Sequence, residues 1–257
     1  MTDPSWPHSA PATAPQYVPS KTVEDFIWSV VEGPPLEHRL LILQGPRGEG
    51  KTTGGLVACV ALAEDLRAKG LASVLPVKVG VVRDTWINLQ RTTLASFEEN
   101  KQKGMPIEFF EGGHEASIMG ADGLELCHFW FFGLDRPDDA DKLQGFTCGV
   151  YWLEEVAPAA SLATGIPDTA MIGTTSVRQA GVPKRTLVTM NPPDDDHWIL
   201  KVEKFLEEQN IREVRCKRFS MGPGEKSAHF EDLARQTTGE ESLAWQMAAD
   251  EFDAYRT

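Results

Sequence analysis

Four short apolar runs along the chain are each followed directly by polar residues. They are Leu40–Leu43, Val77–Val82, Val150–Leu153 and Leu187–Met190, and segments of helical character separate them. Continuous apolar runs of this kind are typical of strands that are buried on both faces of a parallel sheet. Because parallel strands end at one edge, the pattern predicts four polar turns gathered where open α/β folds bind ligands.

The residue pattern changes between the second and third apolar runs. Ile107–Phe110 and Glu125–Phe132 flank glycine-containing turns, which predicts an antiparallel extension or hairpin. Within it, Cys127–Phe132 is expected to be a core strand, although a base-stacking platform is the alternative. The fold class that follows is α/β, with a mainly parallel central sheet flanked by helices and an antiparallel extension.

The remaining segments complete the predicted organisation. Residues 1–20 contain five prolines among small polar residues, which favours a flexible arm, and residues 21–257 are expected to form one domain. Asp84 is a candidate helix cap. Helices are expected at Val23–Val31, through Leu89 and Phe97, and at His197–Glu208, Phe230–Ala234 and Glu241–Phe252, and an extended segment at Val214–Phe219.

Residues 45–52 match the pattern G-x-x-x-x-G-K-[ST] and stand directly behind the run Leu40–Leu43. Such a loop holds phosphates where a buried strand ends and a helix begins, because its backbone N–H groups converge there. A chance match is the alternative, and the strand before and small-residue helix after argue against it. Lys51 is expected to reach the β/γ-phosphates and Thr52 to ligate Mg²⁺. The predicted nucleotide-binding residues are Gly45, Pro46, Arg47, Gly48, Glu49, Gly50, Lys51, Thr52 and Thr53.

Two adjacent acids, Glu154 and Glu155, end the third apolar run. A buried strand that ends in acids is similar to a Walker B element, in which Glu154 would contact Mg²⁺ and Glu155 would orient the attacking water. Asp is commoner in the first position, so Glu154 is a departure. The alternative is a pair of solvated acids at a strand end. The P-loop a hundred residues earlier favours the catalytic interpretation.

Polar residues at two other strand ends are further candidates. Thr189 and Asn191 close the fourth run and could sense the γ-phosphate, although Asn-Pro is also an ordinary turn. Arg83 closes the second run and could pair with phosphate or with a neighbouring acid. Arg178 is a similar candidate. Structural ion pairs explain both arginines equally well.

Composition and charge restrict the partners and the cellular compartment that are expected for this chain. The chain has 257 residues and a formal net charge of −13, which repels free DNA on average. Any DNA contact would need a local basic patch, such as Lys101–Lys103 or Arg212–Arg218, or an oligomeric ring. No apolar stretch is long enough for a membrane span, no signal peptide is evident, and four scattered cysteines without a Cys-x-x-Cys favour a reducing cytoplasm.

Taken together, the motifs resemble the ATPase domain of the large terminase subunit of tailed bacteriophages over about residues 23–252. The segments that carry the resemblance are Gly45–Thr53, Arg83–Thr85, Asp135 with Leu143–Gly145, Tyr151–Glu155, and Thr189–Pro192 with Trp198. The resemblance implies a P-loop NTPase of the ASCE type (additional strand, catalytic glutamate) with ATP and Mg²⁺. It also implies that Thr189 and Asn191 couple hydrolysis to movement and that Arg83 lies near the phosphates, as a catalytic residue with Lys51 and Glu155.

The same resemblance implies the partners. They are double-stranded viral DNA, a portal protein, a small terminase subunit and a homo-oligomeric ring, expected to be a pentamer, in the host cytoplasm. Gln144 stands where related chains often carry an arginine that acts on a neighbouring subunit, so Arg136, Lys142 or Arg178, or Arg47 in the loop, would have to serve. Because the chain stops at Thr257, a C-terminal nuclease domain is expected to be absent.

Two other functions remain open from the residues. One is a P-loop kinase of a nucleotide or small metabolite, although no arginine-rich lid is evident. The other is an ATP-binding assembly switch with little hydrolysis. The adenine pocket is poorly defined: Phe26, Trp28 and Gln44 could contribute to it, and core packing explains the aromatic residues equally well.

Overall fold

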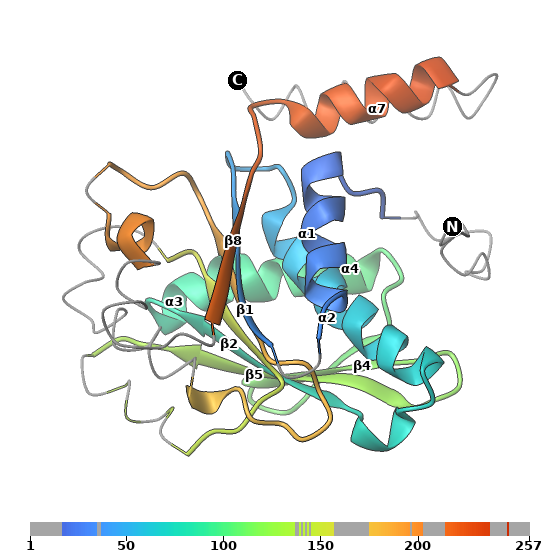
Figure 1. The fold of residues 1–257 in the computed structure, drawn as a ribbon, viewed down its shortest axis with the longest axis vertical. Coiled ribbons are helices and arrows are strands. Elements are labelled where there is room, and N and C mark those ends of the chain that lie inside the picture. The colour runs from blue at the N-terminus through green and yellow to red at the C-terminus, as the bar shows by residue number, and fades with distance from the viewer. Residues whose placement is uncertain are drawn as a thin grey trace.

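The computed structural model describes residues 17–34, 37–136, 139, 141, 143, 145–156, 175–195, 197–202, 214–236 and 246. Within them the strands form one sheet in the order β3-β4-β5-β2-β6-β7-β1-β8, shown in Figure 1. The strands are β1 His38–Gln44, β2 Val77–Arg83, β3 Ile107–Phe109, β4 Glu115–Met119, β5 Glu125–Gly133, β6 Val150–Glu154, β7 Arg185–Met190 and β8 Val214–Ser220. The helices are α1 Lys21–Val31, α2 Lys51–Ala68, η1 Ala72–Val74, α3 Trp86–Asn88, the π-helical η2 Leu89–Leu94, α4 Ala95–Gln102, η5 Trp198–Lys201 and α7 Glu225–Gln236.

The sheet is parallel from β5 to β8 and antiparallel at its other end. Strands β5, β2, β6, β7, β1 and β8 pair in parallel, and β3, β4 and β5 form the antiparallel extension. β7 lies between β1, which leads into the P-loop, and β6, which ends in Glu154. This inserted strand is the arrangement expected of the ASCE type, and the predicted fold class is confirmed.

Alternating residues of the strands fill a core on each face of the sheet. On β1, Leu41 and Leu43 belong to the core beneath α1, α2 and α4, whereas Leu40 and Ile42 belong to the core on the other face. The second core also contains Ile199 of η5. Burial on both faces explains why β1 reads as a continuous apolar run.

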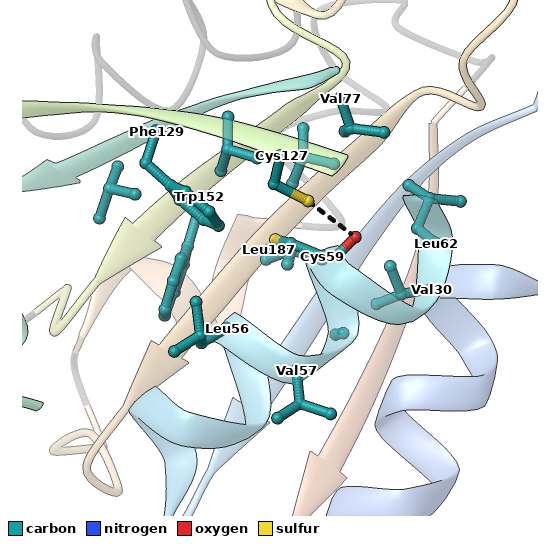
Figure 2. Close-up of a cluster of buried hydrophobic side chains, with 14 of the residues drawn as sticks. Val30, Leu56, Val57, Cys59, Leu62, Val77, Cys127, Phe129, Trp152 and Leu187 are labelled. Atoms are coloured by element: carbon teal, nitrogen blue, oxygen red, sulfur yellow. Dashed lines mark hydrogen bonds between the residues drawn. The ribbon is translucent and has the colours of Figure 1, made fainter. Parts of the chain in front are cut away.

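Helix α2 lies close to the sheet because its first turns carry small residues. A Cβ built on Gly55 would stand 2.4 Å from the indole of Trp152 on β6, so only glycine fits there. Figure 2 shows the same contact region, where Cys59 of α2 faces β5 and the Cys127 thiol donates to the Cys59 carbonyl at 3.4 Å. Close packing fixes the start of α2, and therefore the P-loop, against the strand that carries Glu154.

The amino ends of β1 and β7 hold buried charge that is fully satisfied by backbone. Arg185 is 0% exposed and donates to the carbonyls of Val30, Glu32, Glu37 and Lys184 at 2.7–3.0 Å. Burial lowers the pKa of this guanidinium to about 10, still well above neutral pH. The arginine thus ties the end of α1 to the start of β1.

His38 lies at the same end of the sheet. It is 5% exposed, and its Nε2 is 2.9 Å from the Thr186 hydroxyl. Burial, with nearby Lys184 and Arg185, lowers its pKa from 6.5 to about 4. The imidazole is therefore neutral near pH 7.

Several predicted boundaries need correction. The arm predicted over residues 1–20 ends earlier, because Tyr17 packs on the core and Ser20 is buried and caps α1; residues 1–16 lie outside the described residues. Thr85, not Asp84, caps α3, since its hydroxyl accepts from the Asn88 N–H. The helix predicted at Glu241–Phe252, apart from residue 246, and the second half of the one predicted at His197–Glu208 also lie outside the described residues.

The four cysteines form no disulfide with one another. Cys59, Cys127 and Cys148 are buried and Cys216 is partly buried, all four as free thiols. Among the helices in the described part of the chain, none combines the length and the apolar character that a membrane span needs.

Candidate functional site

The P-loop joins β1 to α2 and has the backbone that its glycines permit. Gly48 and Gly50 have φ of +84° and +80°, in the left-handed region that disfavours side chains. The Gly45 N–H donates to the Met190 carbonyl at 3.2 Å, which ties the start of the loop to the end of β7. The first residue of α2 is Lys51, so the loop ends at a helix N-terminus, where anions are stabilised.

Lys51 lies between the P-loop and the end of β7. Its Nζ donates to the Pro46 carbonyl at 2.7 Å and to Asn191 Oδ1 at 3.1 Å, and the residue is 7% exposed. Burial lowers the pKa of Lys51, and the carboxylates of Glu155, Glu154 and Glu49 oppose that shift. The predicted phosphate-binding lysine and the predicted sensor asparagine are therefore in direct contact.

Glu154 is buried among hydroxyl groups. Its carboxylate accepts a hydrogen bond from Thr52 at 2.6 Å and another from Thr189. The Thr189 hydroxyl in turn accepts from the indole N–H of Trp152 at 2.7 Å. A chain of polar contacts therefore links the P-loop helix to β6 and β7.

The contacts of Glu154 decide whether this place suits Mg²⁺. Burial raises its pKa, while the hydrogen bonds from Thr189 and Thr52 favour the ionised form. Mg²⁺ takes oxygen ligands and usually combines one or two protein oxygens with substrate phosphates. A hydroxyl and a carboxylate 2.6 Å apart beside the P-loop fit that chemistry. No group of three or more His, Cys, Asp or Glu residues that could hold a metal occurs among the described residues, so a cage made wholly of such side chains is not found there.

Glu155 has an unusual backbone. Its φ is +51°, and it is the one non-glycine with a positive φ in the part of the chain that the structure describes. Its N–H donates to the Thr189 carbonyl at 2.7 Å, and its carboxylate accepts from the Asn191 N–H at 3.5 Å. A left-handed residue outside glycine costs energy and is found most often at functional sites. The turn places Glu155 and Lys51 on the two sides of Asn191, so both predicted groups share one site.

Arg83 ends β2 beside the same carboxylates. Its guanidinium is 4.0 Å from Glu154, 3.5 Å from Asp84, and hydrogen bonded to Thr92 and, at 3.3 Å, to Thr93. Its Nε has no hydrogen-bond partner although the side chain is only 11% exposed. Both threonines belong to the π-helical turn η2, and such turns are frequent at functional sites. The structure brings Arg83 to the predicted site without a fixed bidentate partner.

The candidates for action on a neighbouring subunit lie in different places. Arg136 is exposed just beyond the carboxyl end of β5, and Arg47 is exposed on the P-loop. Arg178 follows a bridge between Val177 and Cys148, at the amino end of β6 and away from the P-loop. Lys142 lies outside the described residues. Which of these acts in trans stays a prediction.

Sequence reasoning missed the contribution of α7 to the site. The carboxylate of Glu49 in the P-loop accepts from the N–H of Gly224 at 3.0 Å and of Lys226 at 3.1 Å. Tyr17 and Lys226 both lie next to Gly50. The signal that could have revealed this is the extended segment Val214–Ser220: as a parallel neighbour of β1, it delivers its following turn to the P-loop edge.

Other predicted contacts are divided by the fold. Arg215 and Lys217 of β8 contact Glu37 and Ser29, whereas Arg218 donates to the Ile199 carbonyl on the other face, so these residues do not form one basic patch. Arg212 lies outside the described residues. Phe26 is buried against Phe219, which supports core packing for it, and Gln44 donates to Ser220.

Comparisons with known proteins agree with this architecture. No protein-family model and no curated protein matches the sequence. The large terminase from a thermophilic bacteriophage superposes with a TM-score of 0.51 at 16% identity, over 88% of this chain and 52% of that one. The same phage protein in complex with ADP gives 0.50 at 18%, over 87% and 51%. The large terminase ATPase domain of a Thermus phage gives 0.46 at 14%, over 87% and 92%.

The first two comparisons show the fold. The chain shares the fold of part of a large terminase, as the motifs predicted, and it spans about half the length of that thermophilic phage protein.

Proposed function

We propose that this chain is an ATP-hydrolysing motor domain that drives viral double-stranded DNA into a procapsid. The observation that carries the proposal is the convergence of Lys51, Thr52, Glu154, Glu155 and Asn191 at the carboxyl end of one sheet. The terminase fold supports the motor role, and the phage terminase complex with ADP supports nucleotide binding at such a fold.

Each group has a task that its position suits. The P-loop N–H groups and Lys51 bind the triphosphate, and release of Lys51 from Asn191 frees its amine for that role. Thr52 and Glu154 would hold Mg²⁺. When bound, Mg²⁺ neutralises charge that develops on the phosphate oxygens. Glu155 orients a water molecule for attack on the γ-phosphate and accepts a proton from that water.

Asn191 supports coupling between the reaction and movement. Its side chain contacts Lys51 and its N–H contacts Glu155, so a phosphate that displaces either contact changes the turn after β7. Thr189, two residues earlier, contacts Glu154. The end of β7 and the turn after it therefore contact both Glu154, which would bind the metal, and Glu155, which would orient the water. A segment that couples hydrolysis to movement needs such contacts.

The assembly is part of the same proposal. An arginine from a neighbouring subunit would stabilise the transferring phosphoryl group, and Arg136 and Arg47 are the described candidates exposed at the carboxyl end of the sheet. A homo-oligomeric ring acting on a portal in the host cytoplasm, with a small terminase subunit, follows from the resemblance. With a net charge of −13, DNA contact would need that ring or a local basic patch such as Lys101–Lys103.

The test is turnover and binding measured on the same samples. Glu155→Gln keeps the size and hydrogen-bonding oxygen of the side chain but removes its basicity. We expect it to bind Mg-ATP as the unmodified protein does and to release phosphate about 10²–10⁴-fold more slowly. Lys51→Ala should lose binding itself. Turnover of the unmodified protein should rise with protein concentration and with DNA.

Three outcomes would overturn this assignment. Unaltered turnover in Glu155→Gln would remove Glu155 from the reaction. Transfer of the γ-phosphate to an added alcohol in preference to water would identify a kinase. Binding of ATP without hydrolysis at high concentration and with DNA would identify a switch.

A further inference from the structure

Helix α7 is fastened to the P-loop by a buried carboxylate. Glu49 is 5% exposed and accepts from the Gly224 and Lys226 N–H groups at the start of α7. Glu225 holds the same turn to α1, accepting from the N–H and hydroxyl of Thr22 at 3.0 Å each. Figure 1 shows α7 following β8, the strand beside β1. The first turn of α7 therefore has a fixed position beside the nucleotide site.

That position brings the amine of Lys226 to the P-loop backbone. Its Nζ is 3.5 Å from the point where a Cβ on Gly50 would stand, and the Tyr17 hydroxyl is 3.7 Å from the same point. Gly50 directly precedes Lys51. Two lysines from distant parts of the sequence thus flank one loop whose N–H groups suit phosphate.

The surroundings of Lys226 make its charge sensitive to an added anion. Its pKa is lowered to about 8, chiefly by burial and also by nearby Lys103 just after α4, while Glu49 and Glu99 oppose the shift. The Tyr17 hydroxyl, which also lies beside Gly50, is neutral because burial raises its pKa. On its own helix Lys226 lies over the Phe230 ring at 5.9 Å. A polyphosphate beside Gly50 would favour the charged amine.

We propose that Lys226 is a second phosphate-binding lysine, supplied by α7 to the P-loop site alongside Lys51. The proposal rests on the nucleotide-binding function proposed above and adds a ligand group from the far end of the sequence. It makes α7 part of the binding site, since the helix carries the amine and Glu49 fixes its first turn.

Proton linkage follows from the charge balance. The charged form of Lys226 is lost as pH rises through about 8 in the free protein. The bound triphosphate holds the proton to higher pH, so binding takes up protons above pH 8 and affinity falls as pH rises. Lys51, whose pKa is also lowered, contributes in the same direction, so the share of Lys226 must come from a variant.

Calorimetry with a non-hydrolysable ATP analogue and Mg²⁺ tests the proposal. Titrations at about pH 8.5 in two buffers of different ionisation enthalpy give affinity and proton uptake together. We expect Lys226→Met to bind about tenfold more weakly or worse, as loss of a hydrogen bond to a charged group requires, and to take up fewer protons. Lys69→Met, in an exposed pair with Asp65 of α2, is the matched control and should bind normally.

Lys226→Arg keeps the test decisive if the methionine variant folds poorly. It retains charge at every accessible pH, so its affinity at about pH 9.5 should exceed that of the unmodified protein, with a shallower decline from about pH 7.5. Equal affinity and equal proton uptake in the unmodified protein, Lys226→Met and Lys226→Arg would overturn the role of Lys226 while leaving the nucleotide site intact. Failure of the unmodified protein to bind the analogue would instead overturn the proposed function.

Discussion

At the amino ends of β1 and β7, Arg185 is buried with four backbone carbonyls around its guanidinium. At the carboxyl end of β2, Arg83 is almost as buried, yet its Nε lacks a hydrogen-bond partner and its nearest carboxylates are 3.5 and 4.0 Å away. A charge fixed by backbone dipoles has no capacity left for a ligand. A charge with adaptable partners can turn toward phosphate. One end of the sheet therefore stabilises the fold, and the other carries the proposed site.

The carboxylates follow the same division. Glu37, at the amino end, pairs with Arg39 and Arg215. Glu154, at the carboxyl end, is buried with hydroxyl donors while the Arg83 guanidinium stays 4.0 Å away, and its raised pKa records that cost. Strain adds to it in the left-handed backbone of Glu155. Buried charge and backbone strain at the carboxyl end reduce stability there, as a trade-off between stability and activity predicts for a functional site.

Among the residues of this comparison, the largest expected effect comes from Glu154→Gln. Removing the carboxylate should slow phosphate release about 10²–10³-fold, because several kcal/mol of charge stabilisation depend on it. Unfolding in urea should show unchanged or greater stability, since a costly buried charge is lost. Glu64→Gln, in an exposed pair on α2, is the control. A large loss of stability with normal turnover would reverse the comparison.

The next effect comes from Arg185→Met at the amino end. Four carbonyls would each lose a donor, which should lower the free energy of unfolding by about 3 kcal/mol. ATP affinity per folded molecule should stay normal at temperatures where the variant is folded. Arg67→Met removes exposed pairs with Glu64 and Asp122 and should change stability by no more than about 1 kcal/mol. Equal stability of the two variants would contradict a structural role for Arg185.

The effect expected from His38 depends on pH and approaches that of Arg185 only in acid. Unfolded chains bind the proton near pH 6.5 and the folded protein only near pH 4. Stability is therefore complete above pH 6.5 and is lost as pH falls toward 4, by up to about 3 kcal/mol. Urea unfolding across this range should decline less in His38→Gln, whose amide can still bond Thr186. Identical pH profiles would show that His38 does not carry the acid sensitivity.

The site was predictable where its signals are local. The P-loop and Glu154–Glu155 each follow an apolar strand directly, and parallel strands bring their ends together without further information. The positive φ of Glu155 had no such signal, because it arises from the contacts of the turn with Thr189 and Asn191. The π-helical turn under Arg83 was likewise not evident from apolar spacing.

The contribution of α7 was missed for a different reason. Val214–Phe219 was predicted to be extended, but its sequence does not say that it pairs in parallel with β1. Once that pairing is known, Glu225 and Lys226 must lie near the P-loop. Similarly, Asn100 of α4 reaches Thr53 at 3.3 Å through packing of two helices far apart in sequence. The tertiary structure brings such residues to the P-loop, and their spacing in the sequence alone does not predict it.

A single crystallographic measurement tests the central claim most directly. Crystals grown with Mn²⁺ and a non-hydrolysable ATP analogue should show an anomalous peak about 2.1 Å from the Thr52 hydroxyl, on the side of Glu154, with phosphates within reach of Lys51 and Lys226. The γ-phosphate should face Glu155. A metal peak remote from Thr52 and Glu154, or an analogue bound away from the P-loop, would contradict the account.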